Sequence, residues 1–178
     1  MMQLRAAEAR GKANFGWLDA RHSFSFGHYY DPEWMGDSVL RVINQDLVAP
    51  GGGFATHPHA NMEILTCVLQ GTIEHKDSLG HAEQIPAGDF QLMSAGSGIR
   101  HSEYNPSQTD PLSLLQIWIE PNEFGTPPGY QQKKIESRPG MTLVASPDGE
   151  AGSFVIRWNW PRARRSNGRW LADTVTCR

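Results

Sequence analysis

The sequence predicts an all-β protein, built as a sandwich or a barrel of short strands. Apolar, strand-forming runs recur along the chain at intervals of about ten residues. The gaps between these runs contain glycine or proline, and the totals of 18 Gly and 12 Pro exceed average usage. No stretch has the 3.6-residue apolar periodicity of a long amphipathic helix. These observations favour strands joined by tight turns over βαβ units.

Seven strands are predicted from these runs. They are 38–44 (SVLRVIN), 61–70 (NMEILTCVLQ), 71–77 (GTIEHKD), 81–85 (HAEQI), 89–95 (DFQLMSA), 112–120 (LSLLQIWIE) and 141–146 (MTLVAS). The segments between them, such as APGGG, DSLG and IPAGD, consist of residues that turns prefer. A short helix is also predicted in the N-terminal MQLRAAEAR, and a single turn around 31–36.

Composition restricts the class of protein. The 178 residues include 39% hydrophobic side chains and carry a formal net charge of −3, as expected of a soluble globular protein. No apolar run approaches the ~20 residues needed to span a bilayer. Charged residues interrupt the N-terminal segment where a signal peptide would be apolar. Cys67 and Cys177 are too far apart in sequence to form a spaced metal-binding pair. We therefore expect a cytoplasmic protein without a membrane role.

The last 22 residues, 157–178, differ from the rest because they contain six Arg and one Asp. Arginine interleaved with Trp158, Trp160 and Trp170 could neutralise and stack on nucleic acid. However, some twenty residues without apolar periodicity make a poor binding module. We therefore expect a divergent basic tail and no nucleic-acid partner.

Two pairs of residues have the spacing of metal ligands on strands. Side chains two apart on a strand project from the same face, about 6.6 Å apart at Cα, so His57 and His59 can converge on one cation. His101 and Glu103 repeat this spacing and can approach from a neighbouring strand. Pro58 favours an edge strand, which would leave the metal accessible. An isolated His-x-His is more often a polar strand face, but the second pair favours a four-ligand site.

Other titratable residues are interpreted separately. His75 and His81 flank the DSLG turn, and we expect them on an exposed hairpin surface. Glu63 is an even number of positions from His57 and His59, so on a continuous strand it would project from the same face. It could be a metal ligand, a hydrogen-bond partner of a ligand, or a charge that faces the cavity.

Two motifs resemble those of the cupin superfamily. The spacing of Gly51, His57, Pro58, His59, Glu63 and Gly71 is similar to the first cupin motif, and Gly80, Pro86, Ala87 and Gly88 are similar to the start of the second. Segments 21–32, 40–64, 89–105 and 115–119 closely resemble the pirin family within that superfamily, and the match extends over about residues 15–155. The resemblance implies a cupin fold, which is a double-stranded β-helix or jelly-roll barrel.

The resemblance also implies a metal site. Pirins bind a divalent metal through His-Pro-His and His-x-Glu, which correspond here to His57, His59, His101 and Glu103. Glu63 would then lie on the pocket wall, and Gln91 stands where many cupins have their last histidine. Three imidazoles and a carboxylate suit Fe(II), Zn, Mn, Co, Ni or Cu. The resemblance favours Fe(II).

Two functions follow from the resemblance. Pirin-like proteins are similar to flavonol dioxygenases, so the leading prediction is quercetin 2,3-dioxygenase activity, in which O2 opens the flavonol ring. Glu103 is the expected base that removes the proton of the flavonol hydroxyl, and Glu63 is the rival base. The alternative is a non-catalytic, redox-sensing pirin that binds a protein partner such as a transcription factor.

A pocket for a planar aromatic substrate is expected beside the metal. Its predicted lining residues are Ile64, Met93, Leu115, Ile117 and Trp118. Alternating apolar residues in a barrel are more often plain core, so these five could instead form the interior packing.

The resemblance predicts the domain organisation as well. Residues 1–135 are expected to form an N-terminal, metal-binding cupin domain, and 136–156 to begin a second cupin domain. Pirins continue into a second domain of similar size, which would be incomplete here. We therefore expect an unusually apolar surface where that domain would pack.

Overall fold

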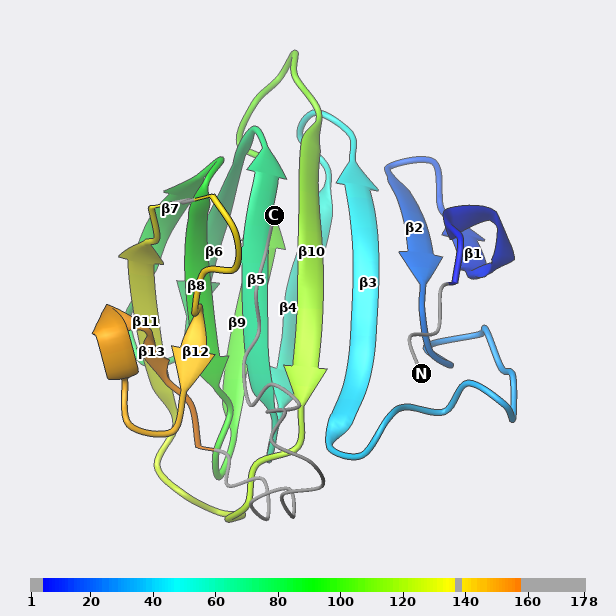
Figure 1. Cartoon of the computed structure of the whole chain (residues 1–178). Helices are drawn as coiled ribbons and strands as arrows, with labels where there is room; N and C mark the ends of the chain where they lie inside the picture. The colour runs from blue at the N-terminus through cyan, green and yellow to red at the C-terminus, as the bar shows by residue number, and fades with distance from the viewer. Residues whose placement is uncertain (1–4, 137–138, 158–178) are drawn as a thin grey trace.

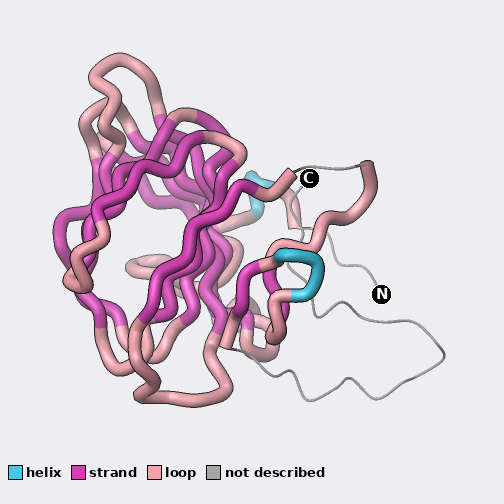
Figure 2. The backbone as a smooth tube through the Cα atoms, turned by 90° about the vertical axis from the view of Figure 1, so that its left-hand side faces the viewer, coloured by secondary structure: helices cyan, strands magenta, loops and turns pink. Residues whose placement is uncertain are grey.

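The computed structural model describes residues 5–136 and 139–157. In this part of the chain, two antiparallel sheets face each other and form a flattened barrel (Figures 1 and 2). The predicted all-β class and barrel architecture are confirmed. The described residues contain no helix that is long and apolar enough to cross a bilayer.

The larger sheet has seven strands, in the order β1-β2-β3-β10-β5-β8-β11. Their bounds are β1 (Gly11–Asn14), β2 (Leu18–His22), β3 (Leu40–Val48), β10 (Leu112–Ile119), β5 (Glu63–Gln70), β8 (Asp89–Ser94) and β11 (Gly129–Lys134). Every neighbouring pair in this sheet is antiparallel. Figure 1 shows β3, β10, β5 and β8 side by side in the front layer.

The smaller sheet has four strands, in the order β4-β9-β6-β7, and lies behind the first in Figure 1. Their bounds are β4 (Gly53–His59), β9 (Ile99–Tyr104), β6 (Thr72–Asp77) and β7 (Ala82–Pro86). β4 is an edge strand of this sheet, and Pro58 within it is exposed, as predicted.

The outer face of the larger sheet is covered by the C-terminal part of the described chain. There β12 (Ala145–Ser146) and β13 (Phe154–Val155) form a short parallel pair, joined through a 3-10 turn at Glu150–Gly152. Val144, Phe154 and Ile156 are buried against outward-facing residues of β5, β8 and β10. Burying such side chains stabilises the fold by about 1.5–3 kcal/mol each. Residues 139–157 therefore add a layer to the sheet.

The inner face of the larger sheet is apolar at both ends of the strands and polar in the middle. One end of the barrel is filled by an apolar cluster, which consists of Leu18, Ala20, Val48, Val68, Ile73, Ile85, Leu112 and Leu114. The opposite end holds a second cluster of Ile64, Met93, Ala95 and Ile99. The residues between these clusters are polar, and they position the site described below.

Most predicted strands are confirmed, with two kinds of exception. β1, β2 and β11 were not predicted, because GKAN, LDARH and GYQQKK lack an apolar run, and the two-residue β13 was not predicted either. β4 and β9 were not among the seven predicted runs and were expected as strands only from the spacing of their ligand pairs. The strand predicted at 141–146 shortens to Ala145–Ser146. The turn around 31–36 is confirmed, since the N–H of Trp34 donates to the carbonyl of Asp31 at 3.0 Å.

The N-terminal helix prediction is wrong over its described part. Ala7–Ala9 form a single 3-10 turn, and Gly11 begins β1. The residue that precedes this turn, Ala6, makes no side-chain cap, and so short a segment cannot offset the cost of helix nucleation. Residues 1–4 and the predicted tail beyond residue 157 lie outside the described residues. The start of a second domain at 136–156 stays a prediction.

Candidate metal centre

Three of the four predicted metal ligands meet on the inner face of the smaller sheet. His57 on β4 lies directly opposite His101 on β9, and their Nε2 atoms are 3.1 Å apart. The ring of His59 lies 4.7 Å from that of His57 and 4.9 Å from that of His101, measured between centroids. The ligand nitrogens of these three residues all lie within 4.8 Å of one another.

The geometry of His57 and His101 fits a shared metal ion. Two nitrogens that bind one ion at about 2.1 Å, at a right angle, are about 3.0 Å apart. The observed Nε2 separation of 3.1 Å matches this value. The Nδ1 of His57 lies 2.8 Å from the carbonyl oxygen of Ala55, which can only accept a hydrogen bond. Nδ1 therefore carries the proton, and Nε2 offers its lone pair to a metal.

His101 is oriented by a second buried histidine. Its Nδ1 lies 3.4 Å from Nδ1 of His75, whose Nε2 lies 3.1 Å from Oδ2 of Asp77. Because the Asp77 carboxylate accepts, His75 donates from Nε2 and presents a lone pair at Nδ1. His101 can then donate from Nδ1, which leaves its own Nε2 free to bind a metal.

The prediction for His75 is wrong, because this residue is fully buried instead of lying on an exposed hairpin. It stands opposite Glu103 on the inner face of β6 and stacks on Tyr130 at 4.6 Å. His81 is partly exposed and donates from Nδ1 to Asp77 at 2.8 Å. The sequence placed both residues beside a turn but did not show that the barrel closes over one of them.

Burial keeps the imidazoles in their metal-binding form. It lowers the pKa of His101 to about 2, with smaller contributions from the neighbouring histidines. Burial also lowers the pKa of His59 to about 4, helped by the nearby His57. Metals bind the neutral imidazole, so no proton has to be displaced from these two rings near neutral pH.

Glu103 lies next to this cluster with both carboxyl oxygens hydrogen-bonded. Gln91 donates to Oε1 at 2.8 Å, and Gln116 donates to Oε2 at 2.6 Å. The pKa of Glu103 is raised to about 7, mainly because the group is buried; the amide donors of Gln116 and Gln91 oppose this rise, and the nearby Asp46 adds to it. A carboxyl oxygen of Glu103 lies within 4.8 Å of ligand nitrogens of both His101 and His75. The carboxyl is thus held at the metal side of the cavity.

Glu63 faces away from this cluster. It shares the outer face of β5 with Leu65 and Cys67, and its Oε2 accepts a hydrogen bond from Ser94 Oγ at 2.8 Å. The described residues that line the cavity do not include Glu63, which differs from its expected place on the pocket wall. Glu63 does not share a face with His57 and His59, because Asn61, with φ of 52°, interrupts the alternation of side chains between β4 and β5.

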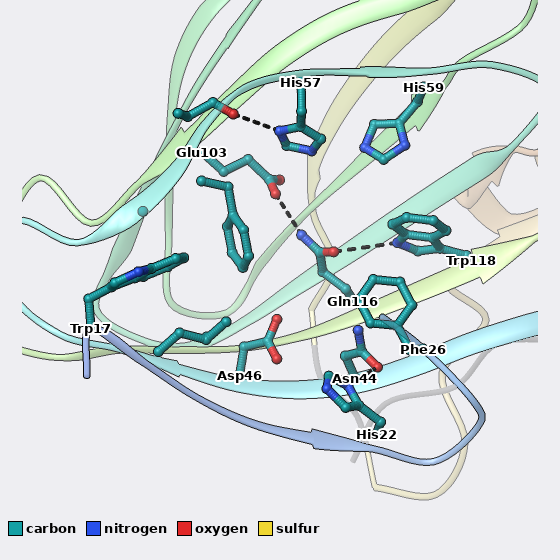
Figure 3. A pocket seen from close by; sticks show the side chains of 14 residues that line it. Trp17, His22, Phe26, Asn44, Asp46, His57, His59, Glu103, Gln116 and Trp118 are labelled. Atoms are coloured by element: carbon teal, nitrogen blue, oxygen red, sulfur yellow. Dashed lines mark hydrogen bonds between the residues drawn. The ribbon is translucent and has the colours of Figure 1, made fainter. Parts of the chain in front are cut away.

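A cavity of about 560 Å³ opens beside the imidazoles, between the two sheets (Figure 3). Its lining residues are Trp17, Leu18, His22, Phe26, Asn44, Asp46, Gly53, Phe54, Ala55, His57, His59, Glu103, Gln116 and Trp118. Aromatic rings meet edge to face on its walls: Trp17 contacts Phe54 at 5.0 Å, and Phe26 contacts Trp118 at 5.3 Å. The ring of Trp118 also lies 4.9 Å from His59. The walls next to the metal centre are therefore aromatic and largely apolar.

Only part of the predicted pocket lining is correct. Trp118 lines the cavity, whereas Leu115 and Ile117 point to the outer face of β10 because they alternate with Gln116 and Trp118. Ile64 and Met93 belong to the apolar cluster at one end of the barrel. Trp17, Phe26 and Phe54 were not predicted to line the cavity, because they come from segments outside the predicted strands.

A row of polar side chains crosses the larger sheet opposite the imidazoles. In cross-strand order the row contains His22, Asn44, Gln116, Thr66, Gln91 and Gln132. His22 Nδ1 lies 2.8 Å from Asn44 Oδ1, and Gln91 donates to Thr66 Oγ1 at 3.2 Å. The available signal was a polar residue within an apolar run, as for Thr66 in β5, Gln91 in β8 and Gln116 in β10.

Comparison with known proteins identifies the family. The family model described as Pirin matches residues 3–119. The chain belongs to the pirin family. This pirin is 59% identical over 156 residues to a quercetin 2,3-dioxygenase of Escherichia coli K12, a match that covers 88% of this chain and 68% of the relative. It is 45% identical over 161 residues to a pirin-like protein of Caulobacter vibrioides, with 88% and 69% covered.

A solved structure supports the same assignment. The crystal structure of the bacterial pirin YhhW from Escherichia coli in complex with nickel(II) is 58% identical to this pirin, with a TM-score of 0.85. The match covers 88% of this chain and 68% of that chain. The cupin fold expected from the sequence motifs is confirmed for this pirin.

Proposed function

We propose that this pirin is a metal-dependent dioxygenase with quercetin 2,3-dioxygenase activity, which opens the ring of a flavonol with O2. The observation that carries the proposal is the position of the imidazole cluster on the wall of an aromatic-lined cavity. A cavity of about 560 Å³ falls within the range of small-molecule sites. A relative with 59% identity is named quercetin 2,3-dioxygenase.

Four residues would hold one divalent transition metal, and we propose iron as that metal. They are His57, His59, His101 and Glu103. A metal bound here supplies Lewis acidity and the redox chemistry that O2 requires. The neutral imidazoles of His59 and His101 and the fixed Nε2 lone pair of His57 support this ligand set.

The aromatic walls would bind the planar ring system of the substrate. Phe26 and Trp118, in edge-to-face contact at 5.3 Å, offer ring surface on one side of the cavity. Trp17 and Phe54 do the same on another side. A ligand held between such rings is shielded from water, which strengthens electrostatic interactions at the metal side.

Glu103 would act as the base. Because a carboxylate bound to a divalent cation stays ionised, Glu103 would have to loosen from the metal for its carboxylate to accept the proton of the flavonol hydroxyl. The amides of Gln91 and Gln116 hold the two carboxyl oxygens in place. Glu63 is not proposed for this step, because its side chain lies on the outer face of β5 and bonds to Ser94.

The test is aerobic incubation of iron-loaded protein with quercetin, followed by the decay of the flavonol absorbance band and the release of carbon monoxide. We expect decay that requires O2 and the metal. Glu103→Gln, assayed at matched metal content, should bind quercetin but not turn it over. Iron-loaded wild-type protein that binds quercetin and leaves it intact in air would contradict the proposal and would favour a non-catalytic role.

A further inference from the structure

Asp46 is a buried carboxyl group on the cavity wall that the metal centre does not use. It lies on the inner face of β3 and is 3% exposed. Its Oδ1 atom has no hydrogen-bond partner among the described residues. Leaving such a group unpaired destabilises the protein, so a partner that arrives with the ligand would recover part of this cost.

The surroundings of Asp46 explain why its oxygen is unpaired. Its cross-strand neighbours in the sheet are Ala20 and Leu114, neither of which has a polar side chain. The nearest polar residue on the same face of β3, Asn44, is already paired with His22 at 2.8 Å. Burial without a partner raises the pKa of Asp46 to about 7. Whether ionised or neutral, the carboxyl keeps an oxygen that can accept a hydrogen bond.

Asp46 and the metal ligands lie on opposite walls of the same cavity. His57 and His59 belong to the smaller sheet, whereas Asp46 belongs to the larger sheet that faces it. Figure 3 shows the two imidazoles on one side of the cavity and Asp46 on the other, with Gln116 between them. A planar ligand that places one end at the metal centre would therefore direct another part of its edge toward Asp46.

We propose that Asp46 is a substrate-binding residue whose free carboxyl oxygen accepts a hydrogen bond from a hydroxyl group remote from the metal-binding end of the substrate. This inference rests on the proposed function, because it assumes an aromatic substrate bound at the metal. It specifies the substrate class as planar aromatics that carry a second hydroxyl. An apolar edge at the same place would leave the carboxyl unpaired, and sites of this kind strongly reject ligands that lack the matching donor.

The inference is tested by ligand binding without turnover. Zinc-loaded protein is titrated under nitrogen with quercetin and with 3-hydroxyflavone, which keeps the 3-hydroxyl and 4-keto groups but lacks the other hydroxyls. Wild-type protein should bind quercetin about tenfold more tightly or better, the effect of one unpaired buried carboxyl. In Asp46→Leu the preference should fall below about threefold, mainly because 3-hydroxyflavone binds more tightly.

Two further variants control for folding and for polarity. Asp46→Asn keeps an acceptor oxygen and should keep most of the quercetin preference. Leu47→Ala changes the adjacent, 47% exposed side chain on the other face of β3 and should leave both affinities unchanged. Zinc content and melting temperature are measured for every variant, so that an unfolded Asp46→Leu is recognised and Asp46→Asn then serves as the test.

The outcomes separate this inference from the proposed function. If wild-type protein has no preference for quercetin, or if folded Asp46→Leu keeps the full preference, the role of Asp46 is overturned while flavonol binding stands. Asp46→Asn decides if Asp46→Leu is unfolded. Loss of the preference for quercetin in Asp46→Asn would then overturn the proposal that the Asp46 oxygen accepts a hydrogen bond from the substrate. If zinc-loaded wild-type protein binds neither flavonol, the proposed function fails, and this inference fails with it.

Discussion

The Nδ1 atom of His101 lies 3.4 Å from the Nδ1 atom of His75, and both residues are buried within the barrel. His75 in turn contacts Asp77, whose carboxylate accepts a hydrogen bond from Nε2 of His75. The lone pair at Nδ1 of His75 then faces the Nδ1 proton of His101, which leaves Nε2 of His101 free to bind a metal. The sequence contains this relationship only as two histidines separated by 26 positions.

Removing His75 should weaken metal binding. In His75→Ala, nothing holds the proton of His101 on Nδ1, and losing such an orienting partner typically costs 10–100-fold in metal affinity. The affinity is measured by competition with a chelating dye, together with the visible spectrum of the cobalt-loaded protein. His75→Gln, which retains an acceptor oxygen, should recover part of the loss. His81→Ala is the control, since His81 bonds to Asp77 and not to His101. Equal metal affinities in His75→Ala and wild type would refute the orienting role of His75.

Metal should stabilise the fold through the same imidazoles. A ligand that binds only the native state at about one hundred times its Kd adds about 2.7 kcal/mol of unfolding free energy. We expect the melting temperature to rise on adding metal to chelator-treated wild-type protein, and to stay constant for His57→Ala combined with His101→Ala. A similar rise in the double variant would place the stabilising ion elsewhere.

Asp46 should make the stability depend on pH. Its pKa in the folded protein, about 7, lies above the value of 3.8 for an unburied Asp. Between these values the folded protein binds a proton that the unfolded chain releases, so stability is lost as the pH rises from about 4 to above 7. Asp46→Asn should therefore be more stable than wild type by about 4 kcal/mol at pH 8. This difference should nearly vanish at pH 4.

Denaturant unfolding of metal-free protein at several pH values measures this effect. Asp46 also raises the pKa of Glu103, so Asp46→Asn also removes the repulsion between these two carboxylates. Both effects raise the stability of the variant above that of wild type at high pH. A stability difference that does not change with pH would show that Asp46 stays ionised in the folded protein.

The aromatic wall should contribute to flavonol affinity. Phe26 contacts both Trp118 and His22, at 5.3 Å in each case, and lines the cavity. Phe26→Ala removes one ring surface, and we expect the Kd for quercetin to rise about tenfold. Phe124→Ala is the matched control, because Phe124 is 66% exposed and does not line the cavity. An unchanged Kd in Phe26→Ala would remove this wall from the binding site.

The apolar strands and the histidine cluster could be predicted from the sequence, because both depend on local alternation. His57 and His59 share one face of a single strand, and His101 on the adjacent strand is aligned with them by antiparallel register. The two-residue period of strands and the residue types were sufficient to predict that these three imidazoles meet.

The remaining features depend on long-range pairing, which local patterns do not encode. The polar row joins residues of six strands, and Asn44 and Gln116 are neighbours only through the sheet order. Glu63 was misplaced because its parity was counted across the turn at Asn61. His75 was misplaced because its burial depends on β11, whose Tyr130 covers it and whose sequence lacked an apolar run.

The central claim is that one metal ion binds between these imidazoles at the cavity wall. Crystals of metal-loaded protein, measured at the absorption edge of the metal, test it directly through an anomalous difference map. We predict one strong peak at about 2.1 Å from a ring nitrogen of each of His57, His59 and His101, with a carboxyl oxygen of Glu103 as the fourth ligand. A map that places the metal elsewhere, and leaves the three imidazoles in contact only with one another, would contradict the claim.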